Sequence, residues 1–436
     1  TLAVDAGELR IDGANAGFSG LAQAGSGLAD GAAFGGRIVL GNADGLGTAD
    51  ALVNSDGELV FDLKGECDFE NDLFGSGKVI AVDGTTVRID RSAEGATEFK
   101  GTYHAQNGST IVFAGDENFS ALGRNEVGIL EGTASAVVDE SGTIRVEYSF
   151  DSDDDKYWIF AQKVSGDGTL VLSTNRPSTG VTLDDVNNQI YFNKTAADWM
   201  TAEETKFSGT VLLENGRLRL QRTDQDNWTE AALKFATLKV GTGGRLMVSD
   251  PDVENNGDSG DQGPHAHEIH GLAFDGGTVR FGQETALITG ADEQKPLLDL
   301  DVLDASGRGT VEINVGSATK LPDAGEFEDW LETHQSFMEQ DDGRALIQLA
   351  QADDVTGTGA NINVDVIAQD DLPLDPVPGD VYENLGDHIV EGKSDEGESL
   401  LQLHYGYGVT IVDGQDNPEN NGLWLSYQLK EVGIYD

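Results

Sequence analysis

The sequence predicts an all-β chain folded as one long parallel β-solenoid (β-helix) of about twelve coils. A six-residue pattern, in which apolar residues alternate with polar or free positions, recurs twelve times. The starts of these repeat segments lie 20 to 33 residues apart, about 27 on average. Glycine is also abundant, at 57 of 436 residues, against about 7% in an average chain. The twelve repeat segments are 7–12, 36–41, 57–62, 85–90, 109–114, 142–147, 168–173, 188–193, 216–221, 244–249, 277–282 and 309–314.

Each repeat segment alternates with period 2, which is typical of a strand with one buried face. A single short strand cannot bury that face alone, but copies stacked about 4.8 Å apart can. A coil of this length leaves room for two further short strands. Glycine before a segment suits the bend between strands. An antiparallel β-sandwich array is the rival fold, and it would need more Asn-Gly or Asp-Gly hairpins than the chain contains. Candidates for the further strands are Val79–Val82, Ala136–Val138, Val211–Leu213 and Leu238–Val240.

Two stretches depart from the pattern. Residues 326–339 place Phe327, Trp330, Leu331 and His334 on one helical face, which predicts a short amphipathic helix. The proline-rich stretch 372–378 predicts a bend or linker. Strand-like segments follow it, and we expect them to cap the solenoid, because the end of such a column must be closed. The expected domains are β-helix repeats at 1–320, a helical insertion with a return strand at 321–352, and a C-terminal capping region at 353–436.

Composition narrows the classes of partner. The chain has 27 basic and 78 acidic residues, a formal charge of −51, which disfavours binding to nucleic acid and to anionic lipid. Cys67 is the single cysteine, so an internal disulfide is impossible. No apolar run is long enough for a membrane helix, and no signal peptide begins at Thr1. We therefore expect either a cytoplasmic protein or one whose signal and anchor lie outside this sequence.

Several motifs invite a chemical interpretation. Gly257-Asp258-Ser259-Gly260 resembles the surroundings of a serine-protease nucleophile, but only one histidine precedes it, so we interpret it as an acidic loop. His265 and His267, with Glu268 or His270, could hold zinc, although a polar loop is the favoured interpretation.

Carboxylates raise two further possibilities. Residues 151–155 offer calcium-type oxygens, yet the loop lacks the glycine and distal glutamate of an EF-hand. Paired carboxylates could also serve a glycan-cleaving β-helix enzyme, but 78 acidic residues guarantee such pairs by chance. We expect no catalytic site, no metal and no cofactor.

Charged residues at the free positions are more informative. Arg10, Arg88, Arg145, Arg219 and Arg280 occupy the same position of five repeat segments, which predicts one outward column. We favour cross-coil ion pairs with the acidic residues that end many segments. The alternative is a long polar face that binds an extended ligand by many weak contacts. The candidate ligand face comprises Arg88, Asp90, Arg145, Glu147, Arg217, Arg219, Arg245 and Arg280.

Two smaller groups add to this face. Arg217, Arg219 and Arg245 form the densest basic cluster, the one plausible place for an anionic glycan. Tyr191, Trp199 and Trp228 could stack on sugars or could close a coil end.

Three segments in order resemble a known repeat: 46–61, 73–103 and 205–220. Together with 271–281 and the terminal Gly422–Leu429, they are similar to passenger domains of type V autotransporters, most of all the AIDA-type, UpaB-like adhesins. The resemblance implies a right-handed, three-sided β-helix exported across the outer membrane of a bacterium and displayed on its surface. It also implies a membrane translocator outside this sequence.

The family resemblance sets the expected function: a non-enzymatic adhesin that contributes to colonisation. Its expected ligand is a host matrix glycoprotein of the fibronectin kind or a glycosaminoglycan, bound along the polar face. Homotypic self-association, giving cell aggregation and biofilm, is the alternative. A polysaccharide-cleaving enzyme is the third hypothesis.

Overall fold

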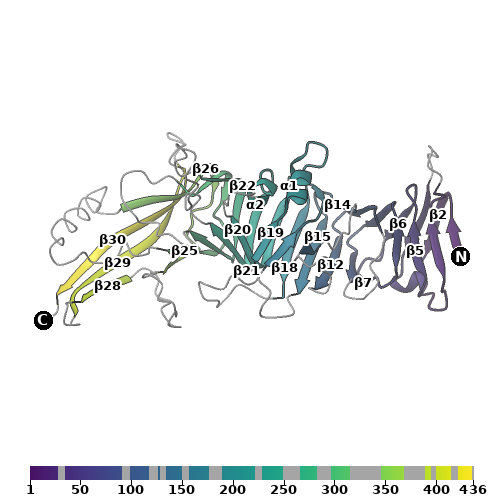
Figure 1. Ribbon diagram of the computed structural model, residues 1–436, viewed down its shortest axis with the longest axis horizontal. Coiled ribbons are helices and arrows are strands. Elements are labelled where there is room, and N and C mark those ends of the chain that lie inside the picture. Colours follow the sequence, from purple (N-terminus) through teal and green to yellow (C-terminus); the bar gives the residue numbers. More distant parts are fainter. Residues whose placement is uncertain are drawn as a thin grey trace. The chain divides into compact units, whose positions relative to one another are not determined.

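The computed structural model describes residues 1–27, 35–90, 99–116, 126–127, 134–149, 157–175, 189–220, 228–248, 266–281, 296–314, 345–367, 388–393, 399–413 and 421–434. These residues are mostly strands, joined in long parallel sheets (Figure 1). The all-β prediction is confirmed. The chain divides into two compact units: unit 1 comprises Thr1–Thr179, Asp185–Arg217 and Ala231–Leu238, and unit 2 comprises Gly180–Asp184, Leu218–Glu230 and Lys239–Asp436.

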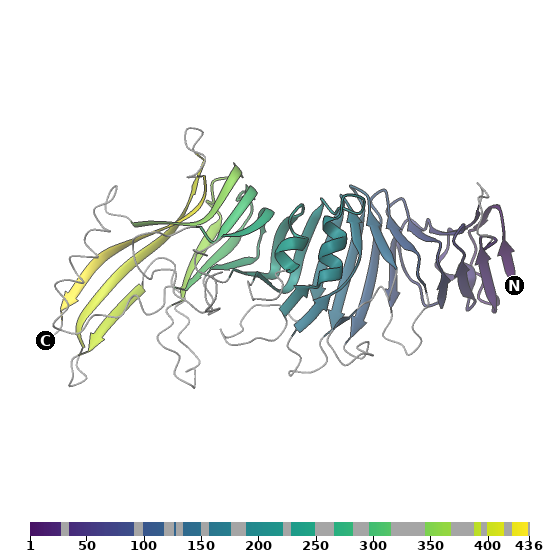
Figure 2. The ribbon, with the colours of Figure 1, turned by 45° about the horizontal axis from the view of Figure 1, so that its top comes forward.

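Unit 1 is built from parallel strands that pair with strands of the preceding and following stretches of chain. Figure 2 shows these strands side by side, from purple to teal. One sheet contains β1 (Leu2–Val4), β3 (Leu21–Ala24), β5 (Asp50–Val53) and β8 (Leu73–Gly75). The seven-stranded sheet contains β2 (Gly7–Ile11), β4 (Gly36–Leu40), β6 (Glu58–Phe61), β9 (Lys78–Ala81), β11 (Thr102–Ala105), β14 (Ser135–Val138) and β17 (Val164–Gly166).

A further parallel set in unit 1 carries the charged residues of interest. It runs through β7 (Glu66–Asp68), β10 (Thr86–Asp90), β12 (Thr110–Asp116), β15 (Thr143–Ser149), β18 (Thr169–Thr174) and the first residues of β20 (Thr210–Leu220). Three short strands also pair in parallel: β13 (Glu126–Val127), β16 (Tyr157–Phe160) and β19 (Gln189–Phe192).

The core of unit 1 consists of columns of apolar side chains in register. Ile38, Leu59, Val79, Tyr103 and Ala136 follow one another across the seven-stranded sheet, and all are buried. Burial of each large apolar side chain contributes about 1.5–3 kcal/mol, so stacking identical positions supplies what one short strand cannot.

Two glycines mark equivalent bends. Gly75 and Gly166 have φ values of 101° and 108°, which side-chain-bearing residues rarely adopt. A Cβ at these positions would lie 2.0 Å from Val53 O and 2.1 Å from Val138 O. Close approach of the neighbouring strand therefore requires glycine at both bends.

Helices are few. The described residues form a 3₁₀ helix (Ala43–Leu46), α1 (Lys194–Thr201) and α2 (Trp228–Ala232). The Asn193 side chain caps α1 by accepting a hydrogen bond of 2.9 Å from Ala196 N. None of the helices in the described part of the chain is long and apolar enough to span a membrane.

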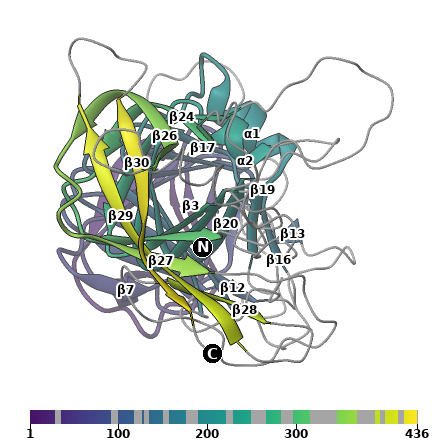
Figure 3. The same cartoon turned by 90° about the vertical axis from the view of Figure 1, so that its left-hand side faces the viewer.

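Unit 2 contains parallel strands followed by an antiparallel group. Its parallel strands are β21 (Thr237–Val248, from Lys239 onward), β22 (His267–Asp275), β23 (Thr278–Phe281), β24 (Leu298–Asp304), β25 (Gly309–Asn314), β26 (Ala345–Thr356) and β27 (Ile362–Ile367). The antiparallel strands are β28 (His388–Lys393), β29 (Ser399–Val412) and β30 (Gly422–Ile434). Figure 3 shows β29 lying along β30.

All twelve repeat segments contain a strand, as predicted, and so do the four further candidates. The C-terminal strand segments are confirmed as β29 and β30. The expected domain boundaries after residues 320 and 352 both fall within unit 2. The predicted helix at 326–339 and the proline-rich bend at 372–378 lie outside the described residues.

The expected single column of arginines is wrong. Arg10 lies in the seven-stranded sheet, where its row continues with Val39, Val60 and Ile80. Arg88 lies in the β7–β20 set and shares a row with Arg145. The reason is the uneven spacing of the repeat segments, because a change of spacing moves the pattern from one sheet to another.

Candidate binding surfaces

A ladder of charged side chains crosses the outer face of the β7–β20 set. Arg88 on β10 donates from Nη1 to Glu147 Oε2 on β15, at 2.6 Å. Arg145 donates from Nε to the other oxygen of Glu147 at 2.6 Å, and its Nη1 donates to Glu214 Oε1 at 2.9 Å. Glu214 also accepts a hydrogen bond of 2.9 Å from Ser173 Oγ. Asp68 completes the ladder, 3.8 Å from Arg88 Nε. These contacts confirm the cross-strand ion-pair interpretation.

The ladder spans more than adjacent strands. Arg88 reaches across β12, and Arg145 reaches across β18. The intervening outer positions hold Val112 and Val171, whose exposed fractions are 3% and 5%. Arginine can bury its apolar stem while its guanidinium stays near water, so these bridges cover the outer-face valines.

The ladder shifts the pKa of its members in opposite directions. The hydrogen bond to Glu214 is the largest cause of a raised pKa for Arg145; burial opposes it, and the hydrogen bond to Glu147 adds to it. Burial would raise the pKa of Glu147, but hydrogen bonds from Arg88 and Arg145 outweigh it and leave that pKa lowered. The hydrogen bond from Arg145 likewise lowers the pKa of Glu214. All three groups are therefore charged at neutral pH.

Sequence reasoning found part of this ladder. It identified Arg88, Arg145 and Glu147, which the fold brings together. It missed Asp68 and Glu214, which lie outside the twelve repeat segments, and Ser173, which ends the segment 168–173 but carries no charge. The strand position of Asp90 is as predicted, and its side chain lies outside the described part.

The predicted basic cluster is not exposed, and this corrects the expectation. Arg217 and Arg219 are only 2% and 8% exposed, because β20 is covered on both faces from Gly216 onward. Arg280 is 2% exposed on β23. Arg245 donates to Glu312 Oε1 at 2.7 Å, and both side chains are nearly buried. These four arginines therefore do not offer an open surface to an anionic glycan.

The predicted histidine group is also dispersed. His267 is buried in β22, with its Nδ1 2.9 Å from Glu230 Oε2. The Nδ1 atom of His270 lies 2.6 Å from Asp301 Oδ2 instead. Across the described residues no group of three or more such side chains could hold a metal ion. His265, the calcium-type residues 151–155 and the Gly257–Gly260 motif lie outside the described residues.

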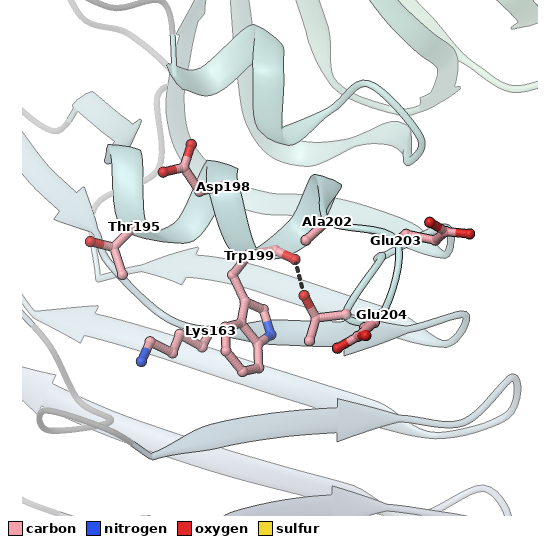
Figure 4. A pocket seen from close by; sticks show the side chains of 8 residues that line it. Lys163, Thr195, Asp198, Trp199, Ala202, Glu203 and Glu204 are labelled. Atoms are coloured by element: carbon pink, nitrogen blue, oxygen red, sulfur yellow. Dashed lines mark hydrogen bonds between the residues drawn. The ribbon is translucent and has the colours of Figure 1, made fainter.

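A pocket of about 590 Å³ beside α1 forms a second candidate surface (Figure 4). Trp199 projects from α1, and Lys163 Nζ lies 5.2 Å from the centroid of its ring. Asp198, Glu203 and Glu204 line the same pocket and are exposed. The indole already carries the Lys163 ammonium, and the carboxylates around it are suited to binding a further cation. We call this site the Trp199 pocket; its full lining is Lys163, Thr195, Asp198, Trp199, Ala202, Glu203, Glu204 and Thr205.

Local hydrogen bonds hold the Trp199 pocket in shape. Thr205 Oγ1 donates to Trp199 O at 2.6 Å, drawn as a dashed line in Figure 4. Phe207 N donates to Met200 O at 2.9 Å, and Phe207 itself is fully buried. The loop that carries Glu203 and Glu204 is thus tied to α1 on one side and to the core on the other. Sequence reasoning identified Trp199 but none of its neighbours, because the lysine and the carboxylates meet only in the fold.

Comparison with known proteins gives one distant relative. A stretch of 248 residues is 25% identical to a protein of Escherichia coli (strain K12) named uncharacterized lipoprotein YdeK. The match covers 54% of this chain and 15% of that protein, so the chain spans a small part of its relative's length. No family model matches the chain, and no solved structure matches it.

Proposed function

We propose that the chain forms a right-handed parallel β-helix of about twelve coils and serves as the passenger of a bacterial surface adhesin. The order of strands in unit 1 supports the fold. Consecutive strands β8, β9 and β10 belong to three different parallel sets, and each pairs with a strand from the preceding stretch of chain. A chain that returns to the same three sheets in order winds as a solenoid.

The proposed activity is non-enzymatic binding of a host matrix glycoprotein of the fibronectin kind. The Trp199 pocket is the observation that carries this proposal. Tryptophan is enriched among the residues that dominate protein interfaces. A lysine or arginine of the partner could pair with Asp198, Glu203 or Glu204 while its apolar stem packs beside Trp199. The net charge of −51 would also accelerate association with a basic partner.

A glycosaminoglycan is the less favoured ligand. Arg88 and Arg145 are held by carboxylates in the ladder, and Arg217, Arg219 and Arg280 are buried. A sulfated polymer would therefore meet a surface of net negative charge, and the electrostatic free energy of binding would be unfavourable.

The location proposed here is the outer surface of a bacterial cell. The lipoprotein named among the relatives supports a place in the cell envelope, and display outside the outer membrane follows from the resemblance to autotransporter passengers. The membrane anchor would be a translocator domain outside this sequence.

The test is binding of immobilised matrix proteins by purified wild-type protein and by three variants. We expect Trp199→Ala and the double variant Glu203→Gln/Glu204→Gln each to weaken binding at least about tenfold. Lys78→Met, which alters a charge on the seven-stranded sheet, is the control and should bind as the wild type does. Binding should weaken as salt rises, because the contacts are charged.

Three outcomes would contradict this proposal. Equal binding by Trp199→Ala and wild type would exclude the pocket, and absence of binding to any matrix protein would exclude the host-adhesin function. Settling of cells that display the protein, without any host ligand, would instead favour self-association.

A further inference from the structure

A strip of apolar side chains lies on the outer face of the seven-stranded sheet, opposite the core. Val39, Val60 and Ile80 follow one another in register, and Val82 packs against them. Their exposed fractions are 4%, 1% and 6%. In an ordinary half-buried sheet these positions would be polar; here, as in the β7–β20 set, the apolar side chains are almost completely covered.

Three residues of this strip, Val39, Val60 and Val82, line a groove of about 310 Å³, near the lower limit of ligand pockets, about 300–1,000 Å³. Five consecutive strands, β2, β4, β6, β9 and β11, each contribute two residues from the strand or its end, so the groove runs across the strands. We call it the valine groove. Its lining is Glu8, Arg10, Arg37, Val39, Val60, Asp62, Val82, Asp83, Gln106 and Asn107.

Two polar atoms in the valine groove are buried and have no hydrogen-bond partner among the residues that the structure describes. Arg37 Nε is a donor whose nearest carboxylate oxygens, on Glu58 and Glu8, lie 3.7 and 3.8 Å away, beyond hydrogen-bond distance. Asp62 Oδ1 is an acceptor; the other oxygen of this carboxylate accepts from Arg10 Nη1 at 2.7 Å. An unsatisfied buried polar atom carries a desolvation cost that no hydrogen bond offsets, and a ligand with matching groups would offset part of it.

The chemistry of the lining defines the ligand class. A hydroxyl group both donates and accepts, so neighbouring hydroxyls could donate to Asp62 and accept from Arg37. The C–H face of a sugar ring could lie against Val82, the apolar residue of the lining that is only partly buried. Glu8, Asp62 and Asp83 outnumber Arg10 and Arg37, which disfavours an anionic ligand.

We propose that the valine groove binds a neutral oligosaccharide of hexose-type units that lies across the strands. Strands repeat every 4.8 Å or so, close to the length of one pyranose unit, so a chain of sugar rings could cross about one strand per ring. The proposal goes beyond the function assigned to the Trp199 pocket, because the site, the ligand class and the residues are different.

The test is titration of the full chain with neutral tetrasaccharides, namely cellotetraose, maltotetraose and chitotetraose, followed by saturation-transfer NMR. At least one should bind the wild type, and a heparin-derived tetrasaccharide should bind more weakly. Arg37→Met and Asp62→Leu should each reduce affinity at least about tenfold, as expected when a hydrogen bond to a charged group is lost.

Each variant has a matched control. Lys78 and Arg37 both lie near Glu58, but only Arg37 lines the groove, so Lys78→Met should retain affinity. Asp12 and Asp62 both bind Arg10, but only Asp62 lines the groove, so Asp12→Leu should also retain it. Thermal unfolding verifies that each variant is folded, and if Asp62→Leu is not, Arg37→Met decides alone.

The proposal is overturned if none of the three neutral sugars binds at millimolar concentration, or if Lys78→Met weakens binding as much as Arg37→Met. Trp199→Ala should leave sugar binding unchanged, and Arg37→Met should leave matrix-protein binding unchanged. Loss of sugar binding in Trp199→Ala alone would assign the sugar to the other pocket and overturn the valine groove. The two proposals can therefore fail separately.

Discussion

Arg145 holds two carboxylates, Glu147 and Glu214, on opposite sides of its guanidinium. We expect Arg145→Met to reduce the free energy of unfolding by about 1–2 kcal/mol, because charge-assisted bonds are lost while partial solvent exposure screens the remaining carboxylates. Chemical denaturation measures the change. Lys194→Met, which breaks an exposed pair with Asp198, is the control and should change stability by about 0.5 kcal/mol or less. Equal effects would mean that the ladder has no special stability.

Cys67 is the second feature that acts at the scale of one residue. Burial in β7, together with the neighbouring charge of Asp68, raises the pKa of its thiol to about 12. Since the thiolate is the reactive form, the native protein should react very slowly with a thiol reagent such as dithionitrobenzoate at pH 8. The same protein in guanidinium chloride should release one equivalent of the chromophore rapidly. Rapid stoichiometric reaction of the native protein would contradict the buried position of β7.

The candidate sites show which residues a sequence can reveal. Arg88, Arg145 and Glu147 stand out because each occupies a free position in a clear repeat segment. Val39 and Val60 do not, since an apolar residue in a strand is read as core whichever face it occupies. Arg280 sits at the same free position as Arg88 yet is buried, because whether an outward face is covered depends on segments far away in the chain.

At the scale of elements, α1 determines where Trp199 lies. Its Asn193 cap satisfies the Ala196 amide, and replacing such a cap by alanine costs about 1 kcal/mol. We expect Asn193→Ala to fray the first turn and weaken matrix-protein binding severalfold, while Asn193→Asp, which retains the cap, should bind like the wild type. Surface binding assays with both variants measure the difference. An equal loss of binding in Asn193→Ala and Asn193→Asp would show that Asn193 does not act as a helix cap.

Strands were predictable for a physical reason, and their partners were not. Period-2 alternation is local, so every repeat segment contains a strand. Which sheet a strand joins depends on the number of residues since the previous turn of chain. The strand that begins at Lys78 pairs with the strand that begins at Glu58, so both lie in the seven-stranded sheet. The next strand, Thr86–Asp90, joins the β7–β20 set instead. Local patterning does not contain that information.

At the scale of the whole molecule, the excess of acidic residues sets two opposing trends with pH. A net charge of −51 destabilises the compact state by self-repulsion. Asp299 in unit 2 is a local example: partial burial, together with the charges of Glu268, Asp353 and Asp301, raises its pKa. A carboxyl group with a raised folded-state pKa disfavours folding while ionised, so its protonation on mild acidification stabilises the protein.

Glu147 and Glu214 act in the opposite direction, since their folded-state pKa values are lowered. The stability that they contribute is complete above their unfolded-state pKa of about 4.3, and it is lost as pH falls through the lower folded-state values. As the pH is lowered from 8, we therefore expect the melting temperature to rise to a maximum at about pH 5 and then to fall below about pH 4. High salt should make the melting temperature depend less on pH above that maximum, because it screens the repulsion between carboxylates. Asp299→Asn should raise the melting temperature at pH 7 and reduce its dependence on pH between 8 and 5. A melting temperature that still increases as the pH is lowered to 3 would show that the ion-paired ladder contributes little.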